Sequence, residues 1–119
     1  MSTRMVSTLV AALVAAPAWP LWAQDDGALE RRGIVLLAQN CSRCHAIGRT
    51  GASSQHQAPP FRTLGQGYPI DNLAEALAEG FSTGHPDMPE FVFEPSEITA
   101  ILTYLQSIQV AKTGPLQRR

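Results

Sequence analysis

The stretch that decides the fold is Cys41-Ser42-Arg43-Cys44-His45, which has the pattern C-x-x-C-H. This pattern is the attachment sequence for a c-type haem. Each cysteine can add to one vinyl group of the haem, and the adjacent histidine can then offer a neutral imidazole nitrogen to the iron. The sequence therefore predicts one covalently bound haem c, with Cys41 and Cys44 as its thioether links and His45 as an iron ligand.

Two other chemistries also use paired cysteines. A zinc site needs a second pair of Cys or His ligands, and the chain has no further cysteine. A redox-active dithiol usually follows a strand in a βαβ unit, and no stretch of this chain alternates convincingly as a strand. A disulfide between Cys41 and Cys44 would close a very short loop and stabilise the fold little. Haem attachment is therefore the favoured interpretation.

The N-terminus has the pattern of an export signal. Arg4 precedes an apolar run over residues 5–16, and residues 21–23 resemble a cleavage site. We expect residues 1–23 to be a cleaved signal peptide, which would place the mature protein in the periplasm without a membrane span. The alternative is that residues 5–23, which carry no charge, stay as a membrane anchor near the minimum length for a span.

Helical periodicity predicts an all-α domain over residues 24–110, followed by a loose polar tail over residues 111–119. The first helix should be capped by Asp25 or Asp26 and should run to about Asn40. A glycine inside this helix costs about 1 kcal/mol relative to alanine, which suggests close approach of another helix. Its inner face should contain Leu29, Gly33, Leu36 or Leu37, and Asn40, widened by Ile34 and Val35.

Two further helices are predicted nearer the C-terminus. The shorter one covers residues 71–79, with Asp71 as its cap and Gly80 as its terminator. The last helix should begin at Glu94 or Ser96, where a proline suits the first turn. Its apolar face recurs at helical spacing through Ile98, Ile101, Leu102, Leu105 and Ile108, widened by Tyr104.

The segment after the haem motif, residues 46–67, is rich in glycine and proline and has little regular pattern. A structureless stretch of this length is unusual in a compact domain unless it covers something. A haem needs wrapping by irregular chain, so the two observations agree. Pro59 and Phe61 are candidate apolar contacts to the ring, although Phe61 could equally belong to the ordinary core.

A second iron ligand is expected in the proline-rich loop of residues 81–91. Met88 is the one methionine that remains once the signal is removed, and a proline on each side stiffens its loop. A thioether held in this way suits the axial position across the ring from His45. The alternatives are His56 and His85, and a histidine in this position would give a lower reduction potential than methionine.

With these motifs the chain resembles the class I mono-haem cytochromes c, and is similar to the haem-c modules of cbb-type oxidases. The resemblance covers about residues 28–109, and the haem motif is its most specific part. It implies the cytochrome c fold, with long loops around one haem and with the first and last helices crossing at Gly33 and Tyr104. It also implies that Pro59, in preference to Pro60, gives its carbonyl to the axial histidine.

The function implied is electron transfer between redox protein partners, not catalysis. His45 and Met88 would fill both axial positions of a monomeric periplasmic carrier. The alternatives are a haem subunit of a dehydrogenase or oxidase complex and, less favoured, a peroxidase or gas sensor from which Met88 dissociates. The chain has 9 basic and 10 acidic residues and a single lysine, Lys112. It therefore has no basic stripe for nucleic acid, nor the ring of lysines with which some cytochromes dock partners.

Overall fold

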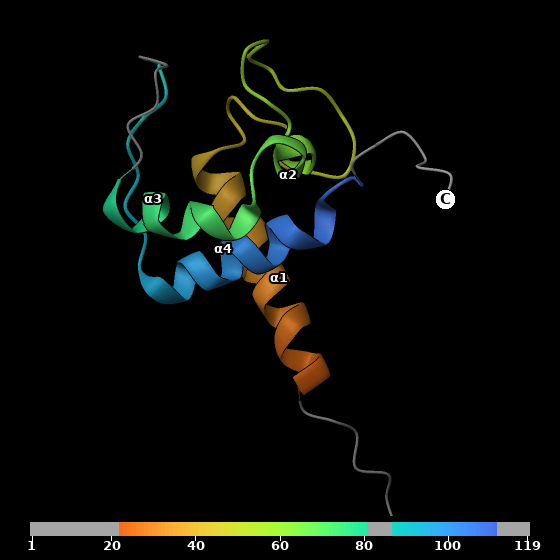
Figure 1. The fold of residues 1–119 in the computed structure, drawn as a ribbon, viewed down its shortest axis with the longest axis vertical. Coiled ribbons are helices and arrows are strands. Elements are labelled where there is room, and N and C mark those ends of the chain that lie inside the picture. Colours follow the sequence, from red (N-terminus) through yellow and green to blue (C-terminus); the bar gives the residue numbers. More distant parts are fainter. Residues whose placement is uncertain (1–21, 81–86, 112–119) are drawn as a thin grey trace, which may run out of the picture.

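The computed structural model describes residues 22–80 and 87–111, and these residues form helices, turns and loops without a strand (Figure 1). The prediction of an all-α fold is confirmed. Most of the proposed signal, residues 1–21, and most of the polar tail, residues 112–119, lie outside the described residues. The elements are α1 (Trp22–Asn40), η1 (Phe61–Thr63), α2 (Leu64–Gly67), η2 (Ile70–Asn72), α3 (Leu73–Glu79) and α4 (Pro95–Ile108). None of the described helices combines the length and the apolar character that crossing a membrane requires.

Helix α1 ends at Asn40, as predicted, but it includes Asp25 and Asp26 instead of being capped by one of them. No proline or other strong breaker lies between Trp22 and Asp26, so the helix can extend further toward the N-terminus. Aspartates inside the first turns are compatible with a helix because negative charge is favourable near its N-terminus.

The crossing of α1 and α4 is the centre of the fold (Figure 1). A Cβ atom built on Gly33 would lie 2.2 Å from the carbonyl oxygen of Ala100 and 2.8 Å from the Cβ atom of Tyr104. These distances are far below van der Waals contact, so only glycine allows the two backbones to come so close. The predicted crossing at Gly33 and Tyr104 is confirmed.

The apolar face predicted for α1 was too wide. Leu37 lies one turn after Gly33 and is buried, but Ile34 is 37% exposed and Val35 is 51% exposed. Successive residues are turned by about 100° around a helix axis, so Ile34 and Val35 point away from the stripe that Gly33 and Leu37 share. Helix α4 covers only that stripe.

Helix α4 has its cap at Glu94, and not at Ser96. The backbone N–H of Glu94 donates to Oε2 of Glu97 at 3.1 Å, while Pro95 occupies the first helical position. Most of its predicted apolar face is buried, although Leu102 is only half-buried, and this face packs in one cluster with residues of α1, η1 and η2. The buried members of that cluster are Leu37, Phe61, Ile70, Ile101, Tyr104, Leu105 and Ile108.

The segment of residues 46–67 is more ordered than expected. Residues 61–67 form η1 and α2, and backbone hydrogen bonds tie the preceding loop to the haem motif. Phe61 N–H donates to the carbonyl of Ala46 at 3.0 Å, and Gln55 N–H donates to the carbonyl of Cys44 at 3.2 Å. This order could not be predicted from a segment rich in glycine and proline, because the hydrogen-bond partners that stabilise it lie many residues away in the sequence.

Helix α3 begins at Leu73, two residues later than expected, because residues 70–72 form the tighter turn η2. Asp71 caps neither element, since its carboxylate accepts a hydrogen bond from Nε2 of Gln106 at 2.5 Å. Gly80 ends α3 as predicted, with a φ of 93° that a side chain would disfavour.

Candidate functional site

The haem motif is a tight turn that continues directly from α1. The N–H groups of Cys41 and Ser42 both donate to the carbonyl of Leu37, at 2.8 and 3.1 Å. The N–H groups of Cys44 and His45 both donate to the carbonyl of Cys41, at 3.2 and 3.0 Å. The rigid end of a packed helix therefore positions both cysteines and the histidine.

Both thiols are free and half-buried. Burial, with a smaller contribution from the neighbouring Cys44, raises the pKa of the Cys41 thiol to about 11. A redox-active dithiol depends on a thiolate with a lowered pKa, so this environment argues against that alternative. In residues 22–80 and 87–111, no group of three or more His, Cys, Asp or Glu side chains is placed to hold a metal ion.

His45 has a defined tautomer. Its Nδ1 atom lies 2.8 Å from the carbonyl oxygen of Pro59. A carbonyl can only accept a hydrogen bond, so Nδ1 carries the proton and the lone pair of Nε2 stays available to a metal. The carbonyl belongs to Pro59 and not to Pro60, which is the choice that the family resemblance favoured.

Phe61 packs against the imidazole of His45, with the two ring centroids 4.6 Å apart and the planes tilted by 33°. It is 8% exposed and belongs to the buried cluster that includes Tyr104 and Leu105. Phe61 therefore joins the core to the histidine, and its contact with the haem ring stays a prediction.

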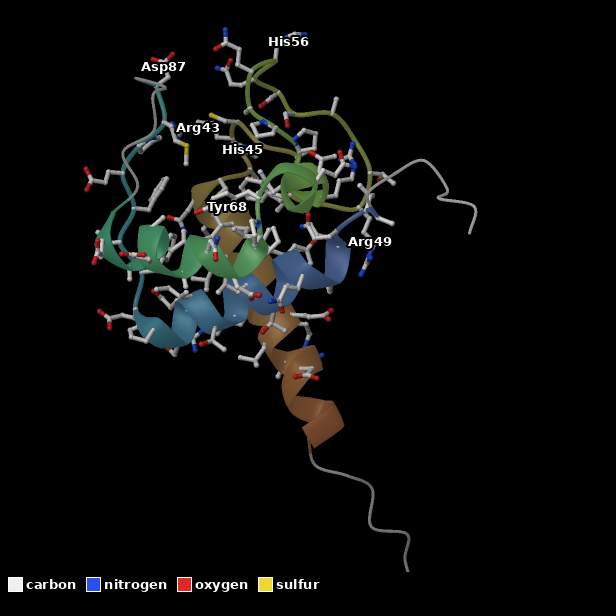
Figure 2. The ribbon with its side chains drawn as sticks, in the orientation of Figure 1. Arg43, His45, Arg49, His56, Tyr68 and Asp87 are labelled. Atoms are coloured by element: carbon white, nitrogen blue, oxygen red, sulfur yellow. The ribbon has the colours of Figure 1, made fainter. Side chains whose placement is uncertain are left out.

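A cavity of about 300 Å³ opens beside the haem motif. One wall comes from the end of α1 and the motif, and the other comes from the segment that carries Met88. Figure 2 shows Arg43 on the first wall and Asp87 on the second. Met88 itself is half-buried, and both of its chain neighbours line the space. The lining residues are Gln39, Asn40, Arg43, Cys44, Asp87, Pro89 and Phe91.

These features fit a covalently attached haem. The cavity adjoins the Cys44 thiol, the histidine beside it has a free Nε2 lone pair, and a thioether-bearing segment forms the opposite wall. The rival ligand His56 is exposed at the outer end of its loop (Figure 2). His85 and Pro86 lie outside the described residues.

The sequence reasoning missed two polar groups of α4 that hold the loop behind His45. The hydroxyl of Tyr104 donates to the carbonyl of Ile47 at 3.0 Å. The side-chain amide of Gln109 bonds to the backbone of Phe61 and Gly65. In the sequence, Gln109 stands out only as a glutamine directly after the last buried residue of a helix. This pattern is too common to identify a role.

The family model described as "Cytochrome C oxidase, cbb3-type, subunit III" matches residues 28–105, about two thirds of the chain. The matched range contains the haem motif, the cavity walls and most of α4. Neither the comparison with curated proteins nor the comparison with solved structures found a match.

Proposed function

This chain belongs to the family described as cytochrome c oxidase, cbb3-type, subunit III, whose domains carry covalently bound haem c, and on that premise we propose that it is a periplasmic electron carrier. In this proposal Cys41 and Cys44 would form the thioether links, and His45 and Met88 would bind the iron. The haem supplies one-electron exchange when bound, and the donor and acceptor are other redox proteins.

The observation that carries the proposal is the hydrogen bond from His45 Nδ1 to the carbonyl of Pro59. It selects the tautomer in which Nε2 is a neutral ligand, and it makes the imidazole a stronger electron donor. Met88 supports the carrier interpretation because its chain neighbours Asp87 and Pro89 line the opposite cavity wall. With two protein ligands on the iron, the site has no open coordination position for a substrate.

Export completes the proposal. Residues 1–23 would direct the chain out of the cytoplasm and then be removed, leaving residues 24–110 as the folded domain and residues 111–119 as a tail. Two free, half-buried cysteines are available for thioether formation in that compartment.

A second candidate is a haem subunit held permanently in an oxidase or dehydrogenase complex. The family description favours it because it names an oxidase subunit. The chemistry at His45 and Met88 would be the same, so the two candidates differ only in assembly. Size-exclusion chromatography of native extract, followed by haem staining, separates a free carrier from a subunit of a large complex.

The test of the proposed function uses the exported protein. Its intact mass should equal the chain from Gln24 plus one haem, and its spectrum should be six-coordinate and low-spin in both oxidation states. The reduced form should not bind carbon monoxide, which distinguishes a carrier from a gas sensor or peroxidase. A mass equal to the bare polypeptide would refute covalent attachment, and binding of carbon monoxide would refute the closed site.

A further inference from the structure

Gln109 directly follows the last residue of α4, and its side-chain amide makes three hydrogen bonds. Oε1 accepts from the N–H of Gly65 at 2.8 Å. Nε2 donates to the carbonyl of Phe61 at 2.9 Å and to the carbonyl of Leu105 at 2.7 Å. The opposite orientation of the amide would place oxygen against two carbonyls and nitrogen against an N–H, so the network fixes the orientation shown.

The bond to Phe61 matters because of what residues 59–61 do. These three residues, the histidine strap, run behind the imidazole of His45. Pro59 accepts the Nδ1 proton at 2.8 Å, and the ring of Phe61 packs on the imidazole with centroids 4.6 Å apart. Phe61 N–H also donates to the carbonyl of Ala46 at 3.0 Å, which attaches the strap to the residue that directly follows the haem motif.

The other attachment of the strap is the end of α4. Besides the Gln109 side chain, the N–H of Val110 donates to the carbonyl of Arg62 at 2.9 Å. The chain also leaves room for the amide: a Cβ atom on Gly65 would lie 2.9 Å from Oε1 of Gln109. Gln109 is half-buried, so water competes only partly for these groups.

We infer that Gln109 is a positioning residue for the axial histidine, acting through the strap without touching His45 or the haem. This inference rests on the proposed function, in which His45 binds the iron. A short, well-directed bond from Nδ1–H to Pro59 increases the electron density on the imidazole, which favours oxidised iron and lowers the reduction potential. When Gln109 no longer holds the strap, this hydrogen bond weakens and the potential rises.

The test compares Gln109→Leu with Gln106→Leu in the haem-loaded protein. Both replacements remove a glutamine amide at the C-terminal end of α4, but Gln106 is exposed and bonds to the side chain of Asp71, not to the strap. Spectroelectrochemistry gives the reduction potential, and proton NMR of the reduced protein gives the solvent exchange of the His45 Nδ1 proton. We expect Gln109→Leu to raise the potential and to speed exchange roughly tenfold, the effect of losing one or two net hydrogen bonds. Gln106→Leu should change neither quantity.

Gly65→Ala provides a second test that leaves Gln109 in place. Its methyl group would press on Oε1 of Gln109, so we expect the same two changes in the same direction. If Gln109→Leu does not fold, Gly65→Ala decides the question. Wild-type potential and exchange in a folded Gln109→Leu or Gly65→Ala protein would overturn the inference. Failure of the proposed function would be visible separately, as a wild-type protein without a low-spin haem spectrum.

Discussion

Met88 is the residue whose replacement separates a closed iron site from an open one. Met88→Ala removes the thioether and should open one axial position. The potential should fall, because a thioether favours reduced over oxidised iron, and the reduced form should now bind carbon monoxide. Met88→His should also lower the potential, but it should keep the iron six-coordinate and closed to carbon monoxide.

The control for Met88 is His56→Ala, which removes an exposed imidazole and should leave both spectrum and potential unchanged. Absorbance spectra of the oxidised proteins, in which the weak far-red sulfur-to-iron band reports the thioether, give the first readout. A parent spectrum in Met88→Ala would assign the sixth position to His56 or His85, and the bis-histidine interpretation would replace ours.

At the scale of elements, the crossing of α1 and α4 makes a prediction about two glycines in one helix. Gly33→Ala places a methyl group 2.2 Å from the backbone oxygen of Ala100, so the helices must separate. We expect a loss of roughly 1–3 kcal/mol in unfolding free energy, the usual cost of overpacking. A Cβ atom on Gly27 would approach only the flexible end of Arg31, at 3.4 Å. Gly27→Ala should therefore cause no loss and could add up to about 1 kcal/mol through helix propensity.

Denaturant unfolding of the haem-loaded proteins measures both glycine variants under one condition. Equal stabilities of Gly33→Ala and Gly27→Ala would show that the crossing tolerates a side chain. Gly33→Leu should lower the unfolding free energy more than Gly33→Ala does, because the larger side chain has no space between the two backbones.

The elements that could be predicted from the sequence are those with signals carried by neighbouring residues. The haem motif, the proline and glutamates at the start of α4, and the glycine that ends α3 are all local signals. The exposure of Ile34 and Val35 could not be predicted in this way, because it depends on how narrow a stripe α4 covers. The order of residues 46–67 and the role of Gln109 depend on hydrogen bonds to residues up to 57 positions away.

At the scale of the whole molecule, the haem is expected to complete the fold. The buried cluster joins α1, η1, η2 and α4, but the haem motif and the Met88 segment face each other across a cavity of about 300 Å³. A covalently held group in that space stabilises only the folded state. The Cys41→Ser, Cys44→Ser double variant should therefore be largely unstructured, as measured by far-ultraviolet circular dichroism. Native-like helical signal without haem would contradict this expectation.

Charge is distributed unevenly over the same molecule. The described residues before Thr63 carry five arginines and three carboxylates, whereas the described residues from Thr63 onward carry seven carboxylates and neither arginine nor lysine. The acidic part includes the cavity wall near Met88. The carboxylate of Glu90 lies against Gly80, and Phe93 N–H donates to the carbonyl of Leu77 at 2.9 Å, so this wall adjoins the acidic helix α3.

We therefore expect a cationic redox reagent to oxidise the reduced protein faster than an anionic reagent does, once both rates are corrected for the difference in driving force. We expect the double variant Glu79→Gln, Glu90→Gln to lower the ratio of the rate with the cationic reagent to the rate with the anionic reagent. The double variant Asp26→Asn, Glu30→Gln should lower this ratio less, although both double variants change the net charge equally. The difference should shrink as salt rises, since the Debye length is about 10 Å at 0.1 M. Stopped-flow rates at two ionic strengths measure this difference. Equal effects of the two double variants on the rate ratio would refute a local negative field near the Met88 segment.

The attachments of the loop behind His45 also have a consequence for the order of assembly. The hydroxyl of Tyr104 and the amide of Gln109 hold this loop near its two ends, at Ile47 and at Phe61. Tyr104 lies in α4 and Gln109 directly follows it, so the ribosome makes both groups after the attachment motif. A nascent chain that stops before Pro95 already has the complete attachment motif but lacks the groups that orient its histidine. The groups that set the final iron geometry are therefore made after the cysteines that attach the haem.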